Sequence, residues 1–180
     1  MSDQAFKGKW ALILGASSGM GAAVSRELAR AGMNIFGVHL DMKATLPLVK
    51  TLIEDIEALG SQAVFFNVNA ADETKRGRVL DKVQATLAAA GGETAVHVLM
   101  HSLAFGTLLP FVHEDPTQRI SKAQMDMTLD VMAHSLVYWT QDLMDRHLLQ
   151  RGSRIFGMTS EGSHRVVTNY GAVSAAKAAL

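Results

Sequence analysis

Short apolar runs alternate with amphipathic stretches along this chain of 180 residues. The run WALIL, residues 10–14, is continuous and ends at a glycine, which is typical of a strand buried on both faces. Residues 46–59 instead place Leu48, Leu52 and Ile56 at helical spacing before a glycine, which predicts a helix and its C-terminal cap. The same reasoning predicts strands at 10–14, 34–38, 63–66, 95–100 and 154–158, and helices at 20–31, 46–59, 73–90, 121–149 (with one break) and 169–180.

The alternation of strand and helix predicts the fold class. Repeated strand–helix–strand units give parallel strands joined by right-handed crossovers. We therefore expect a doubly wound α/β domain of three layers, Rossmann-like, that occupies residues 1–180 as one unit. The longest irregular stretch, 104–120, follows the fourth strand at its carboxyl end, where ligands bind in such folds.

Composition narrows the class of protein. Apolar residues make up 48% and charged residues 19%, which is enough for a sizeable core. Lys+Arg and Asp+Glu balance at 17 each, so neither nucleic acid nor a membrane surface is an expected partner. The absence of cysteine excludes disulfides, zinc thiolates and thiol nucleophiles. No apolar run reaches the ~18 residues of a membrane span, so a soluble cytoplasmic protein is the expectation.

A glycine-rich turn, GASSGMG at residues 15–21, joins the first strand to the first helix. Glycines permit close approaches that a Cβ would block, and the free N–H groups of a helix start attract a diphosphate. This placement inside a strand–helix–strand unit predicts dinucleotide binding, although an ordinary turn is the alternative. The candidate residues are Gly15, Ser17, Ser18, Gly19, Met20 and Gly21.

The G-x3-G-x-G spacing resembles that of the short-chain dehydrogenase/reductase superfamily, which implies NAD(P)H as cofactor. The family position that meets the adenosine ribose falls on His39, and without a carboxylate there the resemblance favours NADPH over NADH. Of the residues that follow, the acidic Asp41 favours NADH and the basic Lys43 favours NADPH. A plain surface turn, whose charges bind no cofactor, is the alternative. Asn67 and Val68, at the end of the third strand, resemble the family's adenine contact.

The segment HSLAF, residues 101–105, resembles the enoyl-acyl-carrier-protein reductase branch of this superfamily. The resemblance places His101, Ser102 and Leu103 beside the cofactor. His97 and His101 lie ~13 Å apart along an extended strand, too far to share a metal, so packing is the simpler role and no metal site is expected.

A tyrosine and a lysine near the end of the chain are the candidate catalytic pair. Tyr170 and Lys177 would share one helix face, ~10 Å apart along the axis. Their Tyr-x6-Lys spacing is that of the enoyl reductases, because four residues before the lysine stands Val173, which donates no proton. The resemblance implies that Tyr170 stabilises an enolate, that Lys177 holds the nicotinamide ribose, and that Ser160 occupies the position of the ketoreductase serine. A helix start that merely contains both residues is the alternative.

The resemblance as a whole implies reduction of a trans-2-enoyl thioester carried on acyl carrier protein or coenzyme A, by a homodimer or homotetramer. A short-chain reductase or dehydrogenase acting on a carbonyl or alcohol is the second hypothesis. A cofactor-binding fragment or pseudoenzyme without turnover is the third. Members of the family normally continue for some tens of residues, so we expect C-terminal strands to be missing from this chain.

Overall fold

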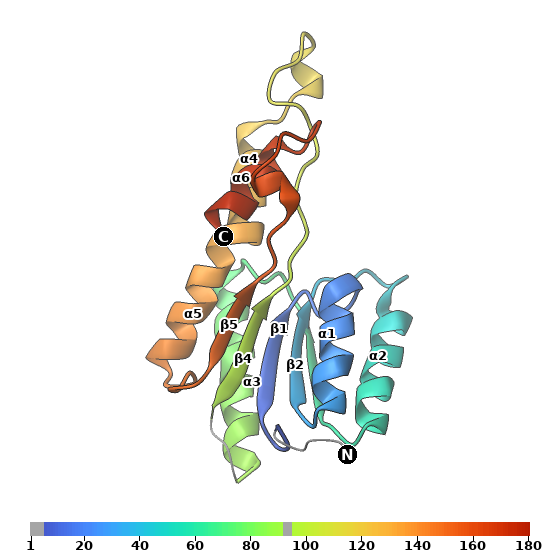
Figure 1. Cartoon of the computed structure of the whole chain (residues 1–180), viewed down its shortest axis with the longest axis vertical. Helices are drawn as coiled ribbons and strands as arrows, with labels where there is room; N and C mark the ends of the chain where they lie inside the picture. The colour runs from blue at the N-terminus through green and yellow to red at the C-terminus, as the bar shows by residue number, and fades with distance from the viewer. Residues whose placement is uncertain (1–5, 92–94) are drawn as a thin grey trace.

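The computed structural model describes residues 6–91 and 95–180 and contains a parallel five-stranded sheet between two layers of helices (Figure 1). The strand order is β3-β2-β1-β4-β5, and every neighbouring pair is parallel. The predicted doubly wound α/β fold is confirmed. The strands are β1 (Trp10–Leu14), β2 (Asn34–His39), β3 (Ala63–Asn67), β4 (Val96–His101) and β5 (Arg154–Gly157).

The continuous apolar run of β1 is explained by helices on both faces of the sheet. Trp10, Leu12 and Leu14 belong to one core cluster, whereas Ala11 and Ile13 belong to a second. Successive side chains of a strand point to opposite faces, so each face receives alternate residues of one unbroken run. All five residues are fully buried.

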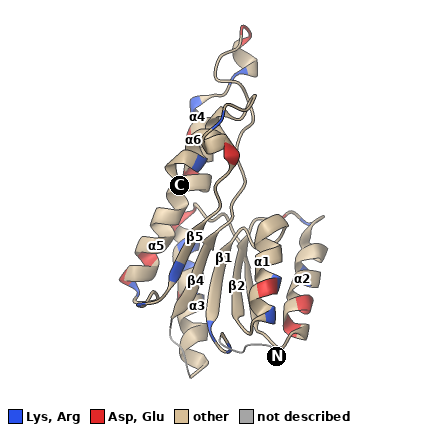
Figure 2. Ribbon diagram, in the orientation of Figure 1, with Lys and Arg blue, Asp and Glu red and all other residues tan. Residues whose placement is uncertain are grey.

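Helices α1 and α2 cover one face of the sheet, and α3 and α5 cover the other (Figure 1). Charged residues are found on these helices, whereas β1 and β2 carry none (Figure 2). Among the described residues, no helix is both long enough and apolar enough to span a bilayer. The helices are α1 (Gly19–Arg30), α2 (Leu46–Ala58), α3 (Glu73–Ala89), α4 (Lys122–Leu129), α5 (Ser135–Asp145) and α6 (Gly171–Ala179), with short turns η1 (Pro116–Gln118), η2 (Asp130–His134) and η3 (Glu161–Ser163).

The helix predicted for 121–149 is divided by a π-helical turn, η2, into α4 and α5. Ser121 starts α4 with a capping box, in which Ser121 and Gln124 satisfy each other's backbone N–H groups. Together with α6 and the loop 104–120, α4 extends beyond the carboxyl ends of the strands (Figure 1). These elements form a wall above the sheet edge where ligands bind in this class of fold.

Candidate active site

The glycine turn brings the ends of three strands together. Gly15 has φ +85°, and a Cβ on it would lie 2.5 Å from the carbonyl oxygen of Ser102, beyond β4. Its N–H donates to the carbonyl of Val38 in β2 at 2.8 Å. A Cβ on Gly21 would lie 2.0 Å from the Gly15 carbonyl oxygen, so α1 approaches the turn more closely than any other residue would permit.

The start of α1 has the features of an anion site. Gly19 has φ +51°, and no described atom lies within 4 Å of where its Cβ would be, so open space faces this backbone. Ser18 is the N-cap, its side chain makes no capping hydrogen bond, and the first turn carries no acidic residue. The first N–H groups of α1 are therefore free for a ligand, and the helix dipole favours a negative one. The turn thus fits the diphosphate of a dinucleotide.

A cleft of about 620 Å³ opens beside this turn at the carboxyl ends of β1, β2 and β4. Most of the predicted cofactor residues line it: Gly15, Ser17, Ser18, Gly19, Met20, His39, Val68, Ser102 and Leu103. Asp41, which the sequence placed near the adenosine ribose, lines the cleft too, and the sequence did not name several others as cofactor contacts: Val38, Leu40, Met42, Asn69, Ala70, Ala104, Phe105, Met127 and Val131. Many of these are apolar, and nothing in their local sequence separates them from core residues.

Two predicted cofactor residues direct their side chains to protein partners. The Asn67 amide bonds the backbone of Asp41 through its oxygen and its nitrogen, at 2.9 Å each. His101 is fully buried, and its Nε2 lies 2.8 Å from Ser135 Oγ. Ser135 Oγ donates to the Val131 carbonyl, so its oxygen accepts from His101, and the imidazole proton is on Nε2. Burial first, and the charge of Lys177 second, lower the pKa of His101 to about 4.

Lys177 is buried where the ends of β4 and β5 come together. Its Nζ donates to the carbonyl of Leu103, a cleft residue, at 3.2 Å, and to the carbonyl of Met158 at 2.5 Å. Burial lowers the pKa of this ammonium. An ammonium has three N–H donors, so these two bonds leave one of them available. Lys177 does not line the cleft itself but a neighbouring hollow, together with Thr159 and Ser163.

Tyr170 immediately precedes α6, and its ring packs on Gly162. A Cβ on Gly162 would lie 2.6 Å from ring atoms of Tyr170 and 3.3 Å from Ser160 Oγ. The tyrosine ring and the serine hydroxyl therefore flank the same glycine. Ser160 Oγ is buried and has no hydrogen-bond partner among the residues that the structure describes. A buried hydroxyl without a partner is costly, and a ligand oxygen would satisfy it.

The residue four positions before Lys177 is Val173, and its side chain packs in the core. Val173 is 4% exposed and belongs to a cluster with Met132. A Cβ on Gly106 would lie 2.8 Å from both Val173 Cγ2 and Met132 Sδ. Val173 thus serves the packing of the core, and Tyr170 remains the candidate donor on this stretch of chain.

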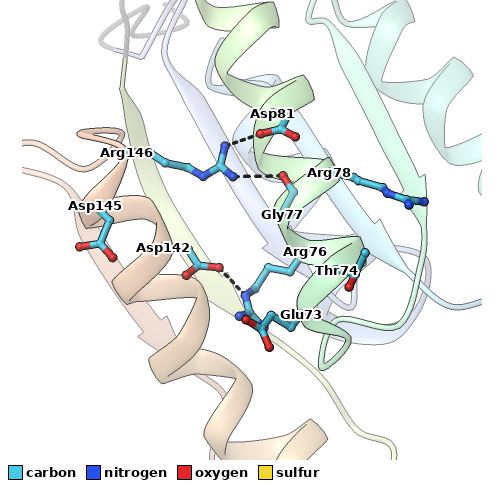
Figure 3. Close-up of a pocket in the computed structure, with 9 residues that line it drawn as sticks. All are labelled: Glu73, Thr74, Arg76, Gly77, Arg78, Asp81, Asp142, Asp145 and Arg146. Carbon is cyan, nitrogen blue, oxygen red and sulfur yellow. Dashed lines mark hydrogen bonds and ion pairs between the residues drawn. The ribbon is translucent and has the colours of Figure 1, made fainter.

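A second cavity, of about 540 Å³, lies between α3 and α5 (Figure 3). Arg76 donates to Asp142 Oδ2 at 2.6 Å, and Arg146 donates to Asp81 Oδ1 at 2.7 Å. Arg76 is almost fully buried and its guanidinium lies 5.4 Å from the ring centroid of Tyr138. These pairs cross-link two helices on the same face of the sheet, which gives the cavity a structural role.

Comparisons with known proteins identify the family to which the chain belongs. The family model described as Enoyl-(Acyl carrier protein) reductase matches residues 15–180. L-xylulose reductase of Bos taurus is 27% identical over 99% of this chain and 64% of its own length. An NADPH-dependent aldehyde reductase-like chloroplastic protein of Arabidopsis thaliana is 26% identical over 96% of this chain and 63% of its own. The chain thus spans less than two thirds of these relatives.

Among solved structures, the angucycline C-6 ketoreductase LanV with bound NADP superposes with a TM-score of 0.83 at 19% identity, over 97% of this chain and 64% of that one. This likeness shows the fold. The match of the family model to nearly the whole chain shows the family: the chain belongs to the short-chain dehydrogenase/reductase superfamily of NAD(P)-dependent oxidoreductases.

Proposed function

We propose that the protein reduces the carbonyl group of an aldehyde or ketone, with NAD(P)H as the reductant. The observation that carries this proposal is the pairing of Tyr170 with the unpartnered hydroxyl of Ser160 around Gly162. Two side chains that carry hydroxyl groups and pack beside one glycine suit a single substrate oxygen on which negative charge develops. The names of the relatives, an L-xylulose reductase and an aldehyde reductase-like protein, support a carbonyl substrate.

Different residues of the chain would bind the two ends of the cofactor. The first N–H groups of α1, with Ser17 and Ser18, would hold the diphosphate of the cofactor in the cleft. The third N–H of Lys177 would bind a ribose hydroxyl and fix the nicotinamide end. A reduced nicotinamide, when bound, supplies a hydride to the substrate carbon.

Tyr170 would donate its phenolic proton to the carbonyl oxygen while the double bond to carbon is reduced. Ser160 Oγ would donate a hydrogen bond to the same oxygen and hold it in position. The buried ammonium of Lys177 favours negative charge in this region, because opposite charges attract strongly away from bulk water. The product is an alcohol.

A second candidate is reduction of the double bond of an enoyl thioester carried on acyl carrier protein or coenzyme A. Two observations favour it: the Tyr-x6-Lys spacing with an aliphatic Val173 in the packed cluster, and the description of the matching family model. An enoyl thioester accepts hydride two atoms beyond the carbonyl carbon. Its oxygen therefore lies further from the nicotinamide, and a tyrosine displaced along the helix suits it.

Oxidation of reduced cofactor by the full-length protein separates the two candidates. The assay compares a panel of ketones and aldehydes with trans-2-enoyl thioesters, using NADH and NADPH in turn. Turnover of carbonyl compounds is the expected result. Turnover of enoyl thioesters alone would reject carbonyl reduction in favour of the second candidate. Cofactor binding with no turnover of either class would reject both and leave a binding protein.

A further inference from the structure

A strained residue directly precedes the candidate donor Tyr170. Among the residues that the structure describes, only Asn169 and His147 adopt a positive φ without being glycine, at +59° and +56°. In this left-handed region the Cβ of an L-residue crowds the backbone, and asparagine tolerates it better than most residues. Such strain persists only where the surrounding structure imposes it. Asn169 does not line the cofactor cleft, so the cofactor does not account for its conformation.

The positive φ belongs to a tight turn. The N–H of Tyr170 donates to the carbonyl of Val167 at 3.1 Å, which closes a β-turn over residues 167–170. Asn169 is the third residue of this turn, whereas Thr168, the second, has no positive φ. A positive φ at the third position alone is the pattern of a type II turn, which takes glycine or asparagine there.

This turn leads directly into the helix that carries Lys177. Tyr170 is the N-cap of α6, and its carbonyl accepts from the N–H of Ser174 at 2.7 Å. The backbone angles of Asn169 set the direction in which the chain enters Tyr170. They therefore also set the direction of the Cα–Cβ bond from which the phenol extends.

The ring of Tyr170 has little room to compensate for a change in that direction. It packs on Gly162, where an added Cβ would lie 2.6 Å from ring atoms and 3.3 Å from Ser160 Oγ. On the following residue, Gly171, an added Cβ would lie 2.5 Å from the ring of Phe111. Because both glycines are closely covered, a shift of the backbone at Tyr170 has to move the phenol relative to Ser160.

The side chain of Asn169 does not explain its place in the turn. It is exposed, and it makes no hydrogen bond to any other residue that the structure describes. Asn169 therefore acts through its backbone conformation. Glycine adopts a positive φ freely, so it is the residue that should replace Asn169 without loss.

We propose that Asn169 is a positioning residue for the reaction: its left-handed backbone directs Tyr170 across Gly162, beside Ser160, to where the substrate oxygen would bind. This role rests on the proposed function, in which Tyr170 is the proton donor. Asn169 itself contacts neither substrate nor cofactor. It acts on the rate of the chemical step and leaves the binding of the cofactor to the glycine turn and Lys177.

Three variants of the full-length protein test this role in the cofactor-oxidation assay. A β-branched residue at positive φ is a true outlier, so Asn169→Val should force the turn to a negative φ. Its kcat should fall about tenfold or more, because small misplacements of a reacting group are costly, while the cofactor dissociation constant stays within about twofold. Asn169→Ala should lie between Asn169→Val and the wild type. Asn169→Gly should keep kcat within about twofold of the wild type.

His147 provides the matched control. It has nearly the same φ, is also exposed, and lies in the turn after α5, outside the cleft. His147→Val should lower the melting temperature by a few degrees, as Asn169→Val does, because both force a β-branched residue into the left-handed region. Only the substitution at Asn169 should lower kcat. A loss of kcat in both would mean that general destabilisation is the cause and would contradict the positioning role.

The outcomes separate this role from the proposed function. If Tyr170→Phe is slow but Asn169→Val and Asn169→Ala turn over at the wild-type rate, the positioning role is wrong and the proposed function stands. If Asn169→Gly is as slow as Asn169→Val, the side chain acts instead of the backbone, which also contradicts the role. If the wild type turns over neither carbonyl compounds nor enoyl thioesters, the proposed function fails and the role fails with it.

Discussion

At the residue scale, Lys177 shows how one side chain serves the fold and the site together. Its ammonium bonds two carbonyls that follow β4 and β5, which joins the strand ends beside the cleft. Thr159 Oγ1 in turn donates to the Lys177 carbonyl at 3.1 Å. The dipoles of the two carbonyl groups thus compensate the buried charge of the Lys177 ammonium. The same two bonds fix the orientation of its third N–H group.

His101 makes the stability of the fold depend on pH. Its pKa in the folded protein is about 4, below the ordinary 6.5, so the unfolded chain binds the extra proton between these values. Stability is therefore complete above pH ~6.5 and falls as the pH falls toward ~4. Between pH ~7 and ~5, where most carboxylates are still ionised, the loss should be about 2 kcal/mol in urea unfolding.

The matched variants for this prediction are His101→Gln and His164→Gln. A glutamine at 101 can still donate to Ser135 and does not titrate, so the pH slope should flatten. His164 is exposed, and its replacement should leave the slope unchanged. A His101→Gln protein with the wild-type slope would show that this imidazole is not the source.

Residue types near the site were predictable, but the directions of their side chains were not. Asn67 and His101 were expected beside the cofactor because their segments, at the ends of two strands, resemble cofactor contacts of the family. Their hydrogen-bond partners stand 26 and 34 residues away along the chain, and only the packed structure brings them together.

At the scale of elements, the glycine turn sets how closely α1 approaches the end of β1. Gly21→Ala would place a methyl group 2.0 Å from a backbone oxygen that cannot rotate away. We expect a loss of about 2–4 kcal/mol in the free energy of unfolding and loss of cofactor binding. Urea denaturation and a cofactor titration measure the two effects.

Gly77 is the matched control, because it lies within α3 and no described atom approaches its Cβ position within 4 Å. Gly77→Ala should stabilise the protein by up to about 1 kcal/mol, since alanine loses less entropy in a helix. Equal stability of the Gly21→Ala protein and the wild type would contradict the close approach.

The elements themselves follow closely from the sequence. The apolar runs placed all five strands, and glycines placed the ends of α1, α2 and α3, because both signals are local. The π-helical turn within 121–149 was foreseen only as an unspecified break. Ser135, which directly follows this turn, lies 2.8 Å from His101 of a distant strand, and a contact of this kind is not encoded in a local pattern.

At the scale of the whole molecule, β5 is one of the two edge strands of the sheet, opposite β3. It pairs only with β4 among the described strands, and its Ile155 and Phe156 are 45% and 51% exposed. Unpaired strand edges with apolar side chains promote association. We therefore expect this chain to self-associate as its concentration rises. Sedimentation velocity would show this as a sedimentation coefficient that increases with concentration.

Phe156→Lys should reduce that association, because a charge on an edge strand opposes pairing. Leu48→Lys is the control: Leu48 lies on α2 and is 67% exposed, away from the edge. Association that responds equally to both substitutions would mean that the edge has no special part in it.

The central claim is that Tyr170 donates to a substrate oxygen beside a cofactor that the rest of the site holds. The most direct test compares wild-type and Tyr170→Phe full-length protein, with turnover and cofactor dissociation constant measured on the same samples. The account predicts that turnover falls about 10²–10³-fold while the dissociation constant stays within about twofold. A Tyr170→Phe protein that turns over at the wild-type rate would contradict it.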